Sequence, residues 1–202
     1  MENKREMACT IFLVAANVIV FFWLSFGGMT EDGWYMLQHG AMYTPYFMNQ
    51  KEYYRIFTSI FLHFGFQHLI NNMLSLVILG RYLEPVVGKV RFLIIYILSG
   101  LAGNLLSLAG DVITGEYAVS AGASGAVFGI TGALLSLTIL NRGRILGITK
   151  QGVMIMIAVS LYNGFASEGV DNLAHIGGLL CGFLVTFLLC FQGNQKRRSY
   201  SL

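Results

Sequence analysis

The sequence predicts an all-α polytopic membrane protein that forms a single domain over residues 1–202 and crosses the bilayer with six helices. Two observations lead to this fold class. The chain is 55% hydrophobic and only 11% charged, whereas roughly a quarter of the residues in a soluble domain are charged. Its apolar runs also reach the roughly 20 residues that a spanning helix needs. Lipid offers no hydrogen-bond partner to an open strand edge, so every span is expected to be helical.

The six expected spans are the apolar runs that lie between charged segments. They cover about residues 8–28, 64–83, 90–109, 121–140, 148–166 and 172–192. The first run follows Lys4 and Arg5, as a secretory signal would. However, Ile11 to Phe26 is long for a signal core, and the glycines and Met29 that follow make a poor cleavage site. We therefore expect an uncleaved first span.

The segment 29–63, between the first and second spans, is the only long outer loop and is rich in aromatic side chains. These are Trp34, Tyr35, Tyr43, Tyr46, Tyr53 and Tyr54. Aromatic residues at this density are typical of a segment that lies in the membrane interface. We expect the loop to rest there rather than in free water.

The distribution of cations predicts the orientation of the spans. With the N-terminus in the cytoplasm, the outer side carries only Lys51 and Arg55. Eleven cations then lie inside: Lys4, Arg5, Arg81, Lys89, Arg91, Arg142, Arg144, Lys150, Lys196, Arg197 and Arg198. This asymmetry follows the positive-inside rule and places both termini in the cytoplasm. The net charge of +3 is therefore explained by the orientation of the spans. The basic tail, residues 196–198, is interpreted as an anchor for the inner leaflet and not as a nucleic-acid site.

Small residues recur at every fourth position in the fourth and sixth spans. The fourth has Ala121, Gly125, Gly129 and Ala133, and the sixth has Ala174, Gly178 and Gly182. Such stripes allow two helix backbones to approach closely. We therefore expect these two spans to touch, with Gly125 allowing the sixth span to approach and Gly122 allowing the turn into the fourth.

Four polar side chains are expected at one depth. The second, fourth and sixth spans all run from outside to inside, and His68, Ser124 and His175 each lie within about the first four residues of their span, roughly 5–10 Å below the outer surface. Asn72 lies one turn below His68 on the same helical face. Ser124 and His175 also flank the small-residue stripes, which favours a hydrogen bond between hydroxyl and imidazole.

This set of groups is typical of acyl transfer. A Ser hydroxyl becomes a strong nucleophile when a neighbouring imidazole takes its proton, and the same imidazole can return the proton to the leaving amine. The oxyanion that forms then requires donors that are already in place. Side chains of His68 and Asn72 can donate, as can the amide of Ser124 in the first turn of its helix. Ser124 and His175 are the predicted nucleophile and base.

Other interpretations of the same residues are possible. Each element alone also fits helix packing, since Gly-x-Ser-Gly is a weak motif and His68 with Asn72 can hold helices together. The spans lack the charged residues that ion-coupled transporters and pumps usually keep, which disfavours a channel or transporter. There is no His-Glu-x-x-His and no pair of aspartates within spans. No metal and no cofactor are expected, and Cys9, Cys181 and Cys190 are interpreted as packing residues.

Over about residues 52–185 the chain resembles the rhomboid intramembrane serine proteases. The resemblance is carried by Tyr54-Arg55 with Phe57-Thr58-Ser59, by His63 with His68-x-x-x-Asn72, by Gly122-x-Ser124-Gly125 and by Ala174-His175-x-x-Gly178. It implies a Ser124–His175 dyad without a third acid. It also implies an oxyanion site formed by His68, Asn72 and the amides of Ala123 and Ser124, and it matches Phe128 to an aromatic residue that packs against the catalytic imidazole.

Two positions depart from the family pattern. Tyr54 stands where the family typically has Trp, which is expected to alter only the anchoring of the loop. Phe128 is often Tyr, so a hydroxyl near His175 is missing here. Neither departure removes a catalytic atom.

The resemblance implies a compact six-span bacterial form in the plasma membrane that cuts other membrane proteins. Cleavage is expected in or near the outer part of a transmembrane helix, after a small residue. Residues 167–171 are expected to act as a mobile cap and the fifth span as a lateral gate. The alternative is a non-catalytic relative that binds transmembrane helices as a chaperone or sorting factor, but such members lose the Ser or the His, and both are present here.

Overall fold

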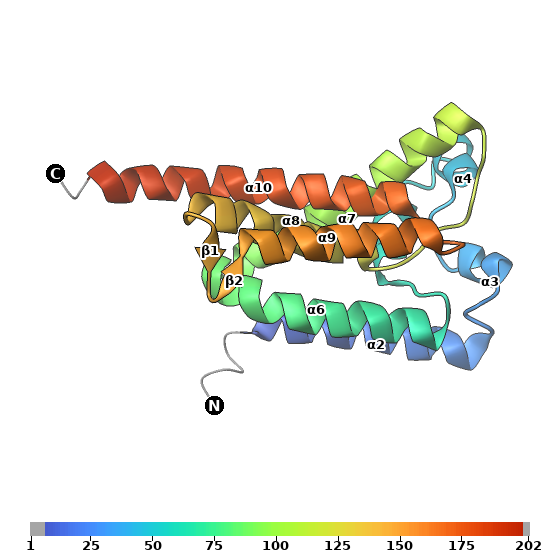
Figure 1. Cartoon of the computed structure of the whole chain (residues 1–202). Coiled ribbons are helices and arrows are strands. Elements are labelled where there is room, and N and C mark those ends of the chain that lie inside the picture. The colour runs from blue at the N-terminus through green and yellow to red at the C-terminus, as the bar shows by residue number, and fades with distance from the viewer. Residues whose placement is uncertain (1–6, 200–202) are drawn as a thin grey trace.

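The computed structural model describes residues 7–199, with side chains described as far as residue 190. It is a bundle of roughly parallel and antiparallel helices (Figure 1). In chain order the elements are α2 (Ala8–Gly27), α3 (Gly33–Gln38), α4 (Thr44–Asn49), α5 (Arg55–Thr58), the 3-10 helix η1 (Ser59–Phe61), α6 (Gly65–Val87), α7 (Lys89–Thr114), α8 (Ser124–Leu140), β1 (Arg144–Ile145), β2 (Ile148–Thr149), α9 (Lys150–Ala166) and α10 (Asn172–Ser199).

Six helices, α2, α6, α7, α8, α9 and α10, coincide with the six predicted runs. By length and composition, α2, α7 and residues Asn172–Cys190 of α10 can each cross a membrane. α6 can be added as a fourth span when it is taken together with Arg55–Phe61, from which it is separated by an 88° bend. α8 is a shorter apolar helix of 17 residues. The start of α2 and the end of α10 lie at the same end of the bundle (Figure 1).

The helix boundaries differ from the predicted ranges for local reasons. α8 starts at Ser124 and not at residue 121, because Gly122 has a φ of +150° that no helix contains. α9 starts at Lys150, after an unpredicted β1–β2 hairpin, and Thr149 accepts a hydrogen bond from the amide of Gly152 to cap it. α7 continues to Thr114, where Gly115 ends it in the left-handed region. Lys4, Arg5 and the side chains of residues 196–198 lie outside the described residues.

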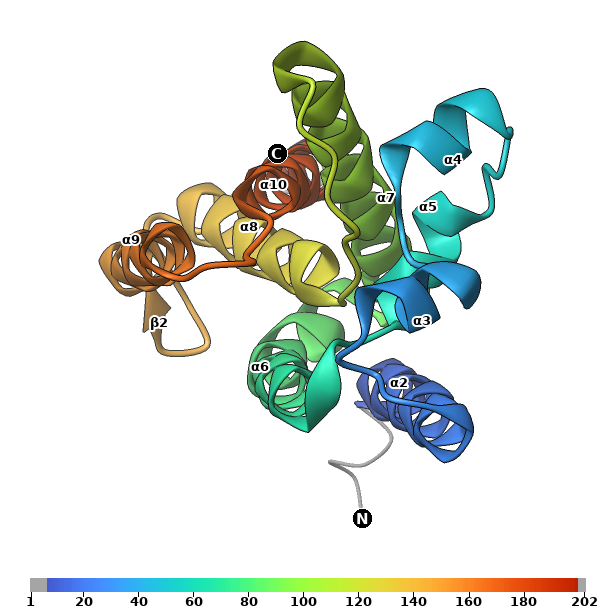
Figure 2. The same ribbon diagram turned by 90° about the vertical axis from the view of Figure 1, so that its right-hand side faces the viewer.

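The centre of the bundle is formed by α7, α8 and α10 (Figure 2). The contact between α8 and α10 confirms the prediction from the small-residue stripes. A Cβ atom at Gly178 would overlap the carbonyl oxygen of Gly125, and one at Gly182 would overlap that of Gly129. Since the obstacles are backbone atoms, these two helices can lie this close only with glycine at the contact points.

At the opposite edge, α2 packs beside α6 (Figure 2). The buried carboxylate of Glu84 in α6 accepts hydrogen bonds from the amides of Cys9 and Thr10, at 2.8 Å each, and from the Thr10 hydroxyl at 2.7 Å. It thereby satisfies amides in the first turn of α2 that have no partner within their own helix. This contact holds the start of α2 against the last turns of α6, at the end of α6 that is expected to face the cytoplasm.

The loop 29–63 is held together by Arg55, which is only 3% exposed. Its guanidinium donates to the carbonyl oxygens of Leu37 and Ala41, at 2.6 and 2.8 Å, and pairs with the carboxylate of Glu52. The rings of Tyr46 and Tyr54 lie over the same guanidinium, at 5.1 and 5.4 Å. The predicted long loop is thus a set of short helices gathered around one cation.

Candidate active site

Ser124 and His175 meet where α8 and α10 begin. The Nε2 atom of His175 lies 2.9 Å from the Oγ atom of Ser124, which is hydrogen-bond distance. Gly125 makes the approach possible, because a Cβ atom there would lie only 3.3 Å from the carbonyl oxygen of Ala174. The two residues that the sequence predicted to interact are therefore in direct contact, with Ser124 as the first residue of its helix.

The ring of Phe128, one turn after Ser124, stacks on the imidazole of His175. The ring centroids are 4.2 Å apart and the planes are inclined by 12°. His175 is 8% exposed, and within the described part of the chain its Nδ1 atom has no hydrogen-bond partner. The imidazole is thus oriented by a stacked ring and by the hydroxyl, without an acid bonded to its second nitrogen.

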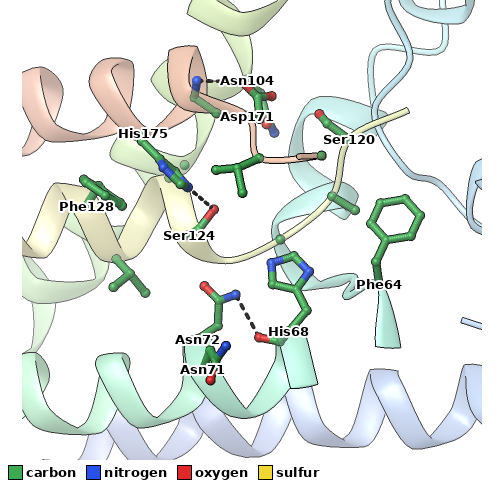
Figure 3. Close-up of a pocket in the computed structure, with 18 of the residues that line it drawn as sticks. Phe64, His68, Asn71, Asn72, Asn104, Ser120, Ser124, Phe128, Asp171 and His175 are labelled. Carbon is green, nitrogen blue, oxygen red and sulfur yellow. Dashed lines mark hydrogen bonds between the residues drawn. The ribbon is translucent and has the colours of Figure 1, made fainter. Parts of the chain in front are cut away.

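His68 and Asn72 lie on α6, across the cavity from His175 (Figure 3). His68 lies against Gly122, where a Cβ atom would be 2.9 Å from Cε1 and 3.0 Å from Nε2 of its imidazole. Asn72 donates from Nδ2 to the carbonyl oxygen of His68 at 3.0 Å. Gly122 therefore has two reasons to be glycine, its positive φ and the closeness of His68.

The extended segment before Ser124 is tied to the outer loop at three points. Ser120 pairs with Met42 through two backbone hydrogen bonds of 2.8 and 2.9 Å. The amide of Gly122 donates to the carbonyl oxygen of Ser59 at 2.9 Å, and the Ala123 amide lies 3.4 Å from Nε2 of His63. This segment is what positions the start of α8.

Two side chains behind this segment were not singled out as site residues from the sequence. His63, named above only as part of the family motif, is 1% exposed, and its ring lies 5.2 Å from that of His68. Asn104 of α7 donates to the hydroxyl of Ser59 and to the carbonyl oxygen of Ile56, both at 2.8 Å. Asn104 could have been identified from the sequence, because it is an asparagine inside an otherwise apolar span.

A cavity of about 630 Å³ lies between the two sides of the site. Besides the residues already described, it is lined by carboxylates from the segment that leads into α10, Glu168 and Asp171, and by Phe64, Asn71, Val127 and Val170. Among the residues that the structure describes, no group of three or more His, Cys, Asp or Glu side chains could hold a metal ion. The chemistry available in the cavity is that of a hydroxyl, imidazoles, amides and carboxylates.

The family model described as the Rhomboid domain matches residues 50–192, which include every residue of this site. The chain belongs to the rhomboid family. This rhomboid is 36% identical over 180 residues to the rhomboid protease GluP of Bacillus subtilis, covering 89% of this chain and 34% of GluP. It is 36% identical over 147 residues to the putative rhomboid protease YdcA of the same organism, covering 72% and 71% of the two chains.

A plant relative, RHOMBOID-like protein 5 of Arabidopsis thaliana, is 42% identical over 145 residues, which is 70% of this chain and 46% of the relative. The rhomboid described here thus spans about a third of GluP and under half of this plant protein. Its family and its apolar helices make it an integral membrane protein.

Proposed function

We propose that this rhomboid is an intramembrane serine endopeptidase that cuts transmembrane segments of other membrane proteins near the outer face of the bilayer. The observation that carries the proposal is the 2.9 Å contact between Ser124 Oγ and His175 Nε2. Imidazole takes the hydroxyl proton as Ser124 attacks the scissile carbonyl, and returns it to the leaving amine. Water then releases the acyl group from Ser124, with His175 acting again as the base.

The oxyanion of the tetrahedral intermediate is stabilised by donors from two elements. The amide of Ser124 belongs to the first turn of α8 and has no partner within that helix. Asn72 uses one N–H on the His68 carbonyl and keeps a second for the oxyanion, and His68 adds an imidazole N–H. The Ala123 amide completes the set, because its contact with His63 is long at 3.4 Å and can be exchanged.

The topology that we propose has six spans in one domain over residues 1–202, with both termini in the cytoplasm and the cavity facing outward. The cation asymmetry supports it, as does the position of the start of α2 and the end of α10 at one end of the bundle (Figure 1). Substrate is proposed to enter beside α9, which acts as a lateral gate, while residues 167–171 cap the cavity. We place the protein in the plasma membrane of a bacterium.

The deciding experiment uses the purified full chain in detergent or liposomes with a single-pass transmembrane substrate. Ser124→Ala and His175→Ala should each abolish cleavage, and Ser124→Ala should also abolish labelling by a serine-reactive fluorophosphonate. Ser136→Ala is the matched control, because Ser136 lies on the same helix and its hydroxyl has no partner among the described residues. Cleavage that survives Ser124→Ala contradicts the mechanism, and a wild type that binds helices without cutting any of several substrates supports the non-catalytic alternative.

Asn72→Ala tests the oxyanion site separately. It removes one donor among several, so the rate should fall about 10- to 10³-fold, less than on loss of Ser124. The measurement is kcat with the same substrate, together with the thermal unfolding midpoint. A variant that fails to fold would instead make Asn72 a structural residue of α6.

A further inference from the structure

The imidazole of His175 becomes a cation during each proposed proton transfer, and its surroundings are mostly apolar. Phe128 covers one face, and the Nδ1 atom has no hydrogen-bond partner among the residues that the structure describes. Forming a charge in such a place is costly unless an opposite charge lies nearby. The carboxylate of Asp171 can supply that charge.

Asp171 immediately precedes α10, one turn before His175. One carboxylate oxygen accepts from the Ala174 amide at 2.9 Å, which caps the helix. The other accepts from the hydroxyl of Ser107 on α7 at 2.6 Å, and Ser107 itself is buried. The carboxylate is therefore held from two sides. It forms no ion pair within the described part of the chain, where Arg55 with Glu52 is the one ion pair within 4 Å.

The position of Asp171 relative to the two halves of the site suits an electrostatic role. Figure 3 shows Asp171 and His175 on the same side of Ser124, and His68 with Asn72 on the opposite side. A negative charge there stabilises an imidazolium while remaining on the far side of the cavity from His68 and Asn72, the two side chains proposed as oxyanion donors. Placed beside His68, the same charge would oppose the oxyanion.

We propose that Asp171 is a positioning residue for His175. Its fixed carboxylate stabilises the imidazolium through space from one helical turn away, and its cap holds the turn of α10 that carries the ring. This inference rests on the proposed function, since it assigns a role within the Ser124–His175 mechanism. It supplies an acid to the site without a bond to Nδ1.

Other titratable groups face the same imidazole and set the background for any test. His68 approaches from α6, and Glu168 lines the cavity from the segment before α10. On α7, the carboxylate of Asp111 accepts a hydrogen bond from the hydroxyl of Thr44 at 2.7 Å, and Asp111 does not line the cavity. The described part of α8 adds only the Ser124 hydroxyl and the Phe128 ring, neither of which titrates near neutral pH. Asp111 is thus a charge-matched control.

The decisive variant is Asp171→Asn, because an Asn side chain can still cap α10 and can donate to Ser107 while carrying no charge. With a transmembrane substrate, kcat should fall about 10-fold with KM little changed. The acidic limb of the pH–activity profile should move down by about 0.5–1 pH unit, because the imidazolium has lost its counter-charge. Asp111→Asn should leave both kcat and the profile as in the wild type.

The titration midpoint of the His175 ring, followed by NMR of the labelled full chain in detergent, separates this inference from the proposed function. It requires no cleavage, so it reports on Asp171 even if the wild type cuts nothing. The midpoint should fall by about 0.5–1 pH unit in Asp171→Asn and stay unchanged in Asp111→Asn. Equal midpoints in wild type and Asp171→Asn overturn the role of Asp171, whereas a wild type without activity overturns only the proposed function.

Discussion

α8 and α9 are both 17 residues long, yet they are held in the bundle in opposite ways. Twelve residues of α8 are buried, including Gly125, Gly129 and Gly132. Only Val153 and Gly164 are buried in α9, and several of its apolar side chains are exposed, Ile155 by 64% and Tyr162 by 72%. One helix is enclosed by its neighbours and the other lies at the edge of the bundle (Figure 2).

The difference separates a tightly packed helix, which carries Ser124, from a loosely packed helix at the edge of the bundle. Helices in lipid gain little from the hydrophobic effect against one another, so close backbone contact is what binds them. α8 has such contacts with α10 at Gly178 and Gly182, and the Ser124–His175 pair lies at the start of this same seam. At α9 a Cβ atom on the buried glycine, Gly164, would meet side chains and no backbone atom, namely the amide end of Asn172 and a methyl group of Val170.

The largest effect is expected from Gly178→Ala, which attacks the α8–α10 seam. The added Cβ atom would overlap the carbonyl group of Gly125. Because this group belongs to the backbone, no side-chain rotation can relieve the overlap. We expect a loss of about 1–3 kcal/mol of stability. Separation of the two helices should lower kcat by about 100-fold, since a shift of 1 Å at a reacting group has that effect. Thermal unfolding in detergent and cleavage kinetics measure the two losses, and a stable, fully active Gly178→Ala would refute the rigid seam.

Phe128→Leu tests whether the stacked ring of Phe128 orients the imidazole of His175. Leucine keeps most of the apolar volume but cannot stack on the imidazole, which now lies 4.2 Å from the Phe128 ring. Stability should change by less than about 1.5 kcal/mol, while kcat should fall about 10-fold because the base is less well oriented. Phe128→Tyr keeps the stack and serves as the control. If Leu and Tyr gave the same kcat, stacking would have no part in the mechanism.

The tightly packed α8–α10 region was far easier to predict from the sequence than the parts that surround it. Small residues at every fourth position identified the α8–α10 contact, and Ser124 with His175 followed from their places beside those stripes. The sequence did not predict the contacts of Asp171 and Asn104, because these contacts involve α7 and no residue spacing indicates which segments pack against α7. The contact of His63 with Ala123 was missed for the same reason, since it joins residues 60 positions apart in the sequence. The β1–β2 hairpin is local, with Ile145 facing Ile148, but strands of two residues each are too short to show an alternating pattern.

The smallest effect is expected from Gly164→Ala, the same substitution placed in α9. Its Cβ atom would meet the amide oxygen of Asn172, which can rotate away, and alanine favours the helix by about 1 kcal/mol over glycine. Stability should therefore stay nearly unchanged. The displaced side chain should loosen the outer end of α9, so cleavage of a transmembrane substrate should rise about twofold if α9 gates entry.

Labelling by the fluorophosphonate should remain as in the wild type, because that small reagent needs no lateral entry. Ala158→Leu is the control on the same helix, since Ala158 is exposed and a larger apolar side chain there meets only lipid. A destabilisation by Gly164→Ala as large as that of Gly178→Ala would mean that α9 is as tightly bound as α8. Substrate would then need a different route to Ser124, and the weak burial of α9 would reflect only its position against lipid.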